Sequence, residues 1–155
     1  MAKDQENKTE QQEAVFRVVG QYAKDVSLEC PMPVFAEGAE QVNVAMDVAV
    51  SAKSLENDNQ HEVLLKLSGE AKDMDGNVRY LAEVEYAGVF QVEGIPDEHL
   101  PAVLSIDGAA LLFPFVRQVF MDLVATSGYR PGMLDPINFQ ALFLQAQKQT
   151  AEKSA

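Results

Sequence analysis

The chain has one cysteine, two histidines and no tryptophan among its 155 residues, and these shortages exclude several classes of protein. Cys30 has no partner for an intrachain disulfide, so the fold must do without disulfide bonds and suits a reducing compartment. His61 and His99 lie far apart in the sequence without the spacing of metal ligands, which argues against a metal site or a histidine base. We expect both histidines to be ordinary surface residues.

Sequence signatures of nucleotide and ester chemistry are also missing. There is no GxGxxG, GxxxxGK[ST] or GxSxG motif, so dinucleotide-binding, phosphate-loop and esterase functions have no support. Pro31 follows Cys30 directly and no basic residue adjoins it, which favours a structural or incidental thiol over a nucleophile. Glu83 and Glu85 are spaced like residues that share the solvent face of a strand, so acid–base catalysis is the weaker interpretation. No catalytic residue, metal or cofactor is expected.

Basic residues are scarce, with 12 Lys and Arg against 24 Asp and Glu and a formal charge of -12. Such a chain repels nucleic acid and anionic lipid surfaces, so its partners should be basic or uncharged. The N-terminal stretch lacks an apolar signal segment, and no run of about 18 uncharged apolar residues occurs. We therefore expect a cytoplasmic protein that neither binds nucleic acid nor inserts into a membrane, and one domain at this length.

Alternation of apolar and polar residues predicts four strands, over residues 15–28, 41–52, 62–72 and 78–90. In the first strand, Tyr22 is predicted on the side of Val26 and Gln21 on the side of Asp25. The Asp75-Gly76 pair predicts a tight hairpin between the last two strands. The proline-rich segment 30–33 predicts a crossover loop between the first two strands.

Beyond Pro96 the apolar spacing changes to three and four residues, which predicts a long amphipathic helix over residues 111–124. Pro114 lies inside this pattern, so we expect a kink or a late start. Asn138 predicts the N-cap of a last helix. The predicted fold is α+β, a four-stranded antiparallel sheet followed by two helices. Residues 15–147 are predicted to form the domain, between flexible polar tails over 1–14 and 148–155.

Five blocks of sequence resemble the SecB protein-export chaperone family, in family order and spacing. They are YAKDVSLE (22–29), LAEV (81–84), GVF (88–90), LFPFVR (112–117) and PINFQALF (136–143). The resemblance implies a homotetramer built as a dimer of dimers, with sheets outside and long helices between them, and no nucleotide or cofactor. One sheet face cannot cover all of the apolar helix surface that the sequence predicts. Assembly into an oligomer would bury the remainder.

The resemblance also implies two binding surfaces. The basic, zinc-containing tail of the SecA translocation motor is expected to dock on an acidic sheet face, at Asp25, Glu29, Leu81 and Glu83. Alternation separately places Asp25 with Glu29, and Leu81 with Glu83, on outward faces. An apolar client groove is expected from the crossover loop, the second strand and the last helix, at Val34, Phe35, Val42, Val44, Met46, Phe139, Leu142 and Phe143. Each groove residue could instead be core or an oligomer contact. The loop reads EGAE over 37–40, where the family often has an aromatic residue that lines the groove.

The expected function is an ATP-independent holdase that keeps unfolded precursor proteins translocation-competent and delivers them to SecA. Two alternatives remain open. A SecB-like chaperone dedicated to one client, such as a toxin–antitoxin partner, would keep the groove without using the SecA face. A small-molecule enzyme of compact α+β type would need a convergent polar pocket.

Overall fold

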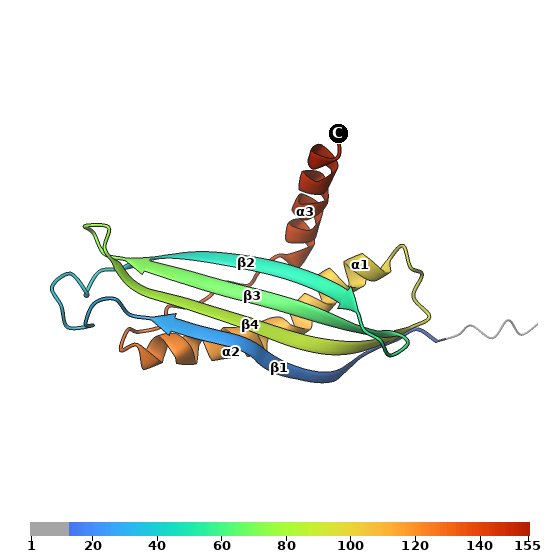
Figure 1. Cartoon of the computed structure of the whole chain (residues 1–155), viewed down its shortest axis with the longest axis horizontal. Helices are drawn as coiled ribbons and strands as arrows, with labels where there is room; N and C mark the ends of the chain where they lie inside the picture. The colour runs from blue at the N-terminus through green and yellow to red at the C-terminus, as the bar shows by residue number, and fades with distance from the viewer. Residues whose placement is uncertain (1–12) are drawn as a thin grey trace, which may run out of the picture.

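The computed structural model describes residues 13–155 as one sheet followed by helices (Figure 1). The strands are β1 (Val15–Glu29), β2 (Asn43–Ser54), β3 (Gln60–Lys72) and β4 (Val78–Glu93). They form an antiparallel sheet in the order β1-β4-β3-β2. The predicted α+β class and four-stranded antiparallel sheet are therefore confirmed. The predicted N-terminal tail, 1–14, lies almost wholly outside the described residues, and the division into one domain and two tails stays a prediction.

One face of the sheet carries the core, and α2 (Ala109–Thr126) packs across it (Figure 1). Alternate residues of β3 and β4 point at the helix and are buried, among them Leu65, Leu67 and Val84. Gly88 lets the helix approach closely, because a Cβ there would lie 2.7 Å from Leu112 Cδ2. We call the opposite side of the sheet the outer face; no described helix packs on it.

The β3–β4 hairpin forms where the Asp75-Gly76 pair predicted it. Gly76 has a φ of +84°, which a residue with a Cβ rarely adopts. The backbone N–H of Asp73 donates to the carbonyl of Asn77 at 3.0 Å and closes the turn. The Asp73 carboxylate then accepts from the backbone N–H groups of Asp75 at 3.0 Å and Asn77 at 2.9 Å.

Two register shifts in β1 overturn part of the predicted alternation. They lie between Val18 and Gly20 and between Ala23 and Asp25. Each shift adds a residue and reverses which side chains face the core. Between the shifts Tyr22 therefore lies on the outer face and not on the side of the core. Gln21 lies opposite Gly88 and therefore on the side of the core. The predicted sides of Tyr22 and Gln21 are thus both wrong. After the second shift the predicted faces are correct again.

The long helix begins earlier than predicted. A continuous helical segment runs from Leu100 to Thr126, as α1 (Leu100–Ala102), the π-helical η1 (Val103–Gly108) and α2. Pro114 lies inside α2, so of the two predicted alternatives the late start is wrong, and the kink stays a prediction. By length and composition this one helix could cross a membrane, but the core helix of a soluble protein has the same properties. Its buried face on the sheet fits the second case.

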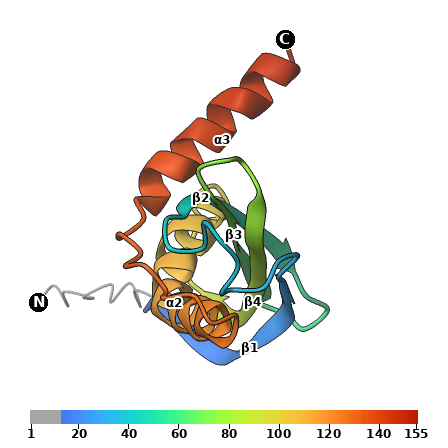
Figure 2. The same ribbon diagram turned by 90° about the vertical axis from the view of Figure 1, so that its left-hand side faces the viewer.

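The last helix, α3 (Phe139–Lys153), projects away from the body formed by the sheet and α2 (Figure 2). Asn138 caps it as predicted, because its Oδ1 accepts from the backbone N–H of Ala141 at 3.0 Å. The helix continues to Lys153, past the start of the predicted C-terminal tail. Its contact with the body lies at its first turns, where Phe139 packs edge-to-face on Phe113 with ring centroids 5.8 Å apart.

Candidate functional site

The four residues predicted for the acidic docking surface lie together on the outer face. Glu29 is paired with Leu81, and the next outward residue of β4, Glu83, is paired with Ser27. Asp25 follows in the adjacent row, opposite Glu85. These rows border a shallow depression of about 240 Å³, lined by Ser27, Glu29, Ser68, Gly69, Glu70, Leu81, Ala82 and Glu83. An apolar leucine among carboxylates suits a partner with both basic and apolar side chains.

Two lysines partly neutralise this acidic region. Lys66 Nζ lies 3.1 Å from Glu83 Oε1 and 3.9 Å from Glu85 Oε1, and Lys72 Nζ lies 2.7 Å from Glu70 Oε1. The hydrogen bond to Glu83 raises the pKa of Lys66 above its ordinary value. All of these side chains remain partly in water, so the pairs are weak and a cationic partner can exchange with the lysines.

A second polar cluster on the outer face joins β1, β2 and β3. The nearly buried Glu62 accepts from the Tyr22 hydroxyl at 2.9 Å and from Lys24 Nζ at 2.7 Å, and Lys53 Nζ lies 3.5 Å away. The hydrogen bond from Lys24 lowers the pKa of Glu62 against the opposing effect of burial. Sequence reasoning missed this cluster, because the register shift that turns Tyr22 outward leaves no signal in the alternation.

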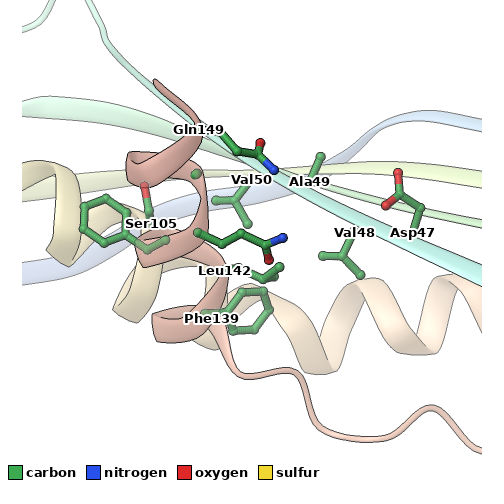
Figure 3. A pocket seen from close by; sticks show the side chains of 11 residues that line it. Asp47, Val48, Ala49, Val50, Ser105, Phe139, Leu142 and Gln149 are labelled. Carbon is green, nitrogen blue, oxygen red and sulfur yellow. The ribbon is translucent and has the colours of Figure 1, made fainter. Parts of the chain in front are cut away.

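A hollow of about 530 Å³ lies between β2 and α3 (Figure 3), and we call it the β2–α3 pocket. Leu142 and Phe139 of α3 face Val48 and Val50 of β2 across it (Figure 3). The predicted groove residues Phe139, Leu142 and Phe143 all line it. Sequence analysis missed Val48, Val50 and Ser105, although both valines continue the β2 alternation that selected the predicted strand residues.

A smaller apolar hollow of about 160 Å³, the β2–α2 pocket, holds the predicted Val44 and Met46. Strand β4, the end of α2 and the loop before α3 form its other walls, at Tyr80, Phe120, Val124, Pro131, Gly132, Met133 and Leu134. The loop 131–134 was not among the predicted groove residues, and its composition carries no periodic signal. Together the two pockets place apolar surface along the core-facing side of β2.

The remaining predicted groove residues lie outside both pockets. Val34 and Val42 are partly buried against the core. Phe35 is 89% exposed on the crossover loop. The predicted client residues thus lie in the two pockets, against the core and on the crossover loop, whereas the acidic residues lie on the outer face.

Residues 13–155 contain no group of three or more His, Cys, Asp or Glu side chains that could hold a metal ion. His61 is buried, not on the surface as predicted, because the register of β3 turns it toward the end of β2, where Nδ1 lies 3.3 Å from Ser54 Oγ. His99 is exposed, and its Nε2 lies 3.5 Å from Glu98 Oε1. Cys30 is exposed.

A four-stranded antiparallel sheet covered by one long helix, with a second helix projecting from the body, is the fold of SecB-like chaperones. A SecB-like chaperone of Mycobacterium tuberculosis, solved in complex with a ChAD peptide from the HigA1 antitoxin, matches with a TM-score of 0.67. The match covers 79% of this chain and 90% of that one at 13% identity, which establishes the fold alone.

Sequence comparison gives the family. The profile of the preprotein translocase subunit SecB matches residues 9–150. The protein-export protein SecB of Magnetococcus marinus is 42% identical over 138 residues, covering 88% of this chain and 87% of the relative. That of Desulfotalea psychrophila is 36% identical over 143 residues, covering 90% and 91%. The chain belongs to the SecB family, whose members are soluble protein-export chaperones and not enzymes, and which bind unfolded client proteins.

Proposed function

We propose that this chain is an ATP-independent holdase in the cytoplasm, which binds unfolded precursor proteins and delivers them to SecA for export. The observation that carries the proposal is the position of two chemically different surfaces. Apolar pockets lie along β2 and α3, and carboxylates surround Leu81 on the outer face. A carrier needs such an arrangement, because it must hold a client and contact the next partner at the same time.

The β2–α3 and β2–α2 pockets fit unfolded polypeptide. Their walls are mainly aliphatic and aromatic, with Met46 and Met133 adding side chains that adapt to different partners. Each buried methylene contributes about 0.8 kcal/mol, so many weak contacts along an extended chain give tight binding. A compact folded protein hides these groups, so selection follows exposure and not a sequence motif.

The outer face fits the basic, zinc-containing tail of SecA. Asp25, Glu29 and Glu83 supply negative charge beside the apolar Leu81. Complementary charge speeds association and makes it sensitive to salt. Partial neutralisation by Lys66 keeps the surface from binding every cation equally well.

A homotetramer, arranged as a dimer of dimers, completes the proposal. On α2, Leu111 and Phe115 lie one turn apart and each is 47% exposed, although the Phe115 ring also stacks on Tyr86 of β4 with ring centroids 6.4 Å apart. The edge strand β1 exposes Val18, Val19 and Val26. Contiguous apolar surface on a helix and an adjacent sheet edge is typical of an oligomer interface.

The test is capture of an unfolded polypeptide. A reduced, carboxymethylated protein that cannot refold should bind without ATP, and its native, disulfide-intact form should not. Equal binding of both forms, or a requirement for ATP, would contradict the proposal.

A chaperone dedicated to one client remains the second candidate, because the fold neighbour from Mycobacterium tuberculosis is bound to an antitoxin peptide. Identification of the polypeptides that copurify with the protein separates the two. Many unrelated precursors support general export, and a single species supports the dedicated chaperone.

A further inference from the structure

The crossover loop between β1 and β2 is fastened to the β3–β4 hairpin by a buried guanidinium. The Arg79 side chain is 1% exposed. Its Nε donates to Asp73 Oδ2 at 2.8 Å, and its Nη2 lies 2.7 Å from the same oxygen. Nη2 also donates to the backbone carbonyl of Glu37 in the loop. Nη1 is buried without a hydrogen-bond partner among the described residues.

This arrangement is not the one that stability alone would favour. Burying an arginine with an unsatisfied donor carries a desolvation penalty, and apolar residues of similar volume often replace a buried ion pair without loss of stability. A role in holding the loop explains why a charged pair occupies this buried position.

The Asp73 carboxylate that binds the guanidinium is itself held in place by hydrogen bonds within the hairpin. It accepts from the backbone N–H groups of Asp75 and Asn77 and from the Asn77 side-chain amide at 3.2 Å. These bonds lie within the hairpin and do not depend on the loop. Among the hydrogen bonds of residues 13–155, the bond from Arg79 to Glu37 relates the position of the loop to that of the hairpin.

Gly38 fits this contact for two separate reasons. Its φ is +89°, and a Cβ there would lie 2.8 Å from Arg79 Nη2. On the other side of the loop, Val34 packs against Gly128, where a Cβ would lie 3.2 Å from Val34 Cγ1. The loop is thus held at Val34 and at Glu37, and the exposed Phe35 lies between these two points.

We propose that Arg79 is a positioning residue, which latches the crossover loop to the hairpin and so holds Phe35 in place for binding an unfolded polypeptide. The binding half of this inference rests on the proposed holdase function. A loop that is already ordered loses little conformational entropy when a client binds. Releasing the loop should therefore speed client dissociation, which is the rate that most interface changes affect.

The test variant is the double substitution Asp73→Asn with Arg79→Met, which removes both charges and leaves neither one buried alone. Arg79→Lys is the conservative variant, because its single ammonium keeps the charge but cannot bond to Asp73 and Glu37 in the same way. The matched control is Glu152→Gln with Lys148→Met, which removes one negative and one positive charge from exposed positions near the end of α3.

Hydrogen exchange and client dissociation are measured together. In the double variant we expect backbone amides of residues 34–42 to exchange at least about tenfold faster, with those in the middle of β3 and β4 unchanged. The reduced, carboxymethylated polypeptide should dissociate at least about threefold faster. Phe35→Ser should accelerate dissociation in the wild type and have a smaller effect in the double variant. Arg79→Lys should be intermediate, and the control should match the wild type.

Each contrary result has a distinct meaning. Unchanged exchange over residues 34–42 in the double variant would overturn the latch. Faster loop exchange with an unchanged dissociation rate, or no effect of Phe35→Ser in the wild type, would overturn its role in binding. If the wild type captures no unfolded polypeptide, the proposed function fails, and the exchange experiment still decides whether Arg79 holds the loop.

Discussion

The alternation of apolar and polar residues does not predict the polar cluster around Glu62. Glu62 lies almost buried on the outer face, between the Tyr22 hydroxyl and two lysines. The hydrogen bond to Glu62 raises the pKa of Tyr22, and the bond from Lys24 lowers the pKa of Glu62. The carboxylate thus ties β1 to β3 where β1 bulges.

The pKa of Glu62 predicts how stability depends on pH. A carboxylate whose folded-state pKa is lowered stabilises the fold above its unfolded pKa, 4.5 here, and loses this effect as the pH falls through the folded-state value. Glu62→Gln should therefore lower the free energy of unfolding at neutral pH. We expect a loss of only about 1 kcal/mol, because water screens Lys24 and Lys53. Below the folded-state pKa the difference from the wild type should vanish. Urea denaturation at a series of pH values measures this, with the exposed Glu56→Gln as control. A difference that stays constant in acid would argue against the assignment.

At the scale of the secondary-structure elements, local pattern predicted much of the fold. Alternation located all four strands, and Asp75-Gly76 located the hairpin. Asn138 located the start of α3, because an N-cap is a local feature of the chain. These signals depend on residues near one another in sequence.

The missed features depend on contacts between distant residues. The register shifts in β1 are fixed by its pairing with β4. The burial of Arg79 depends on the crossover loop, where its partner Glu37 lies 42 positions away in the sequence. The early start of the long helix, through a π-helical turn with Gly108 against Val63, likewise follows from packing on the sheet. The candidate site follows this division only in part: Val44, Met46, Phe139 and Leu142 on predicted elements were selected, whereas Val48 and Val50 on the same predicted strand and the loop 131–134 were not.

The N-cap of α3 has a consequence for binding. Asn138→Ala removes the acceptor for Ala141 N–H and should destabilise the first turn by about 1 kcal/mol. Because Leu142 and Phe143 line the β2–α3 pocket from this part of the helix, client affinity should fall as well. Hydrogen exchange of α3 and client binding test this together. Asn138→Asp keeps a capping oxygen and should behave like the wild type; equal losses in both variants would contradict the capping role.

At the scale of the whole molecule, exposed apolar surface predicts assembly. Light scattering should report four times the subunit mass of 17.0 kDa at micromolar concentration. Leu111→Lys places a charge on the outward side of α2 and should weaken assembly at least about tenfold, because an unpaired charge in an interface is strongly unfavourable. Gln147→Lys, on the exposed part of α3, is the control with the same added charge. A stable, compact wild-type monomer would contradict the proposed role of α2.

In the proposed function, the client and SecA occupy different surfaces of one protein. Titration of the basic, zinc-loaded SecA tail into the client-loaded and client-free protein, followed by fluorescence anisotropy, distinguishes separate surfaces from a shared one. We predict that the client changes tail affinity less than about twofold. Glu83→Lys should weaken tail binding at least tenfold, or about 1.4 kcal/mol, and leave client binding unchanged. Displacement of the tail by the client, or equal loss of both by a tetrameric Glu83→Lys variant, would contradict separate surfaces.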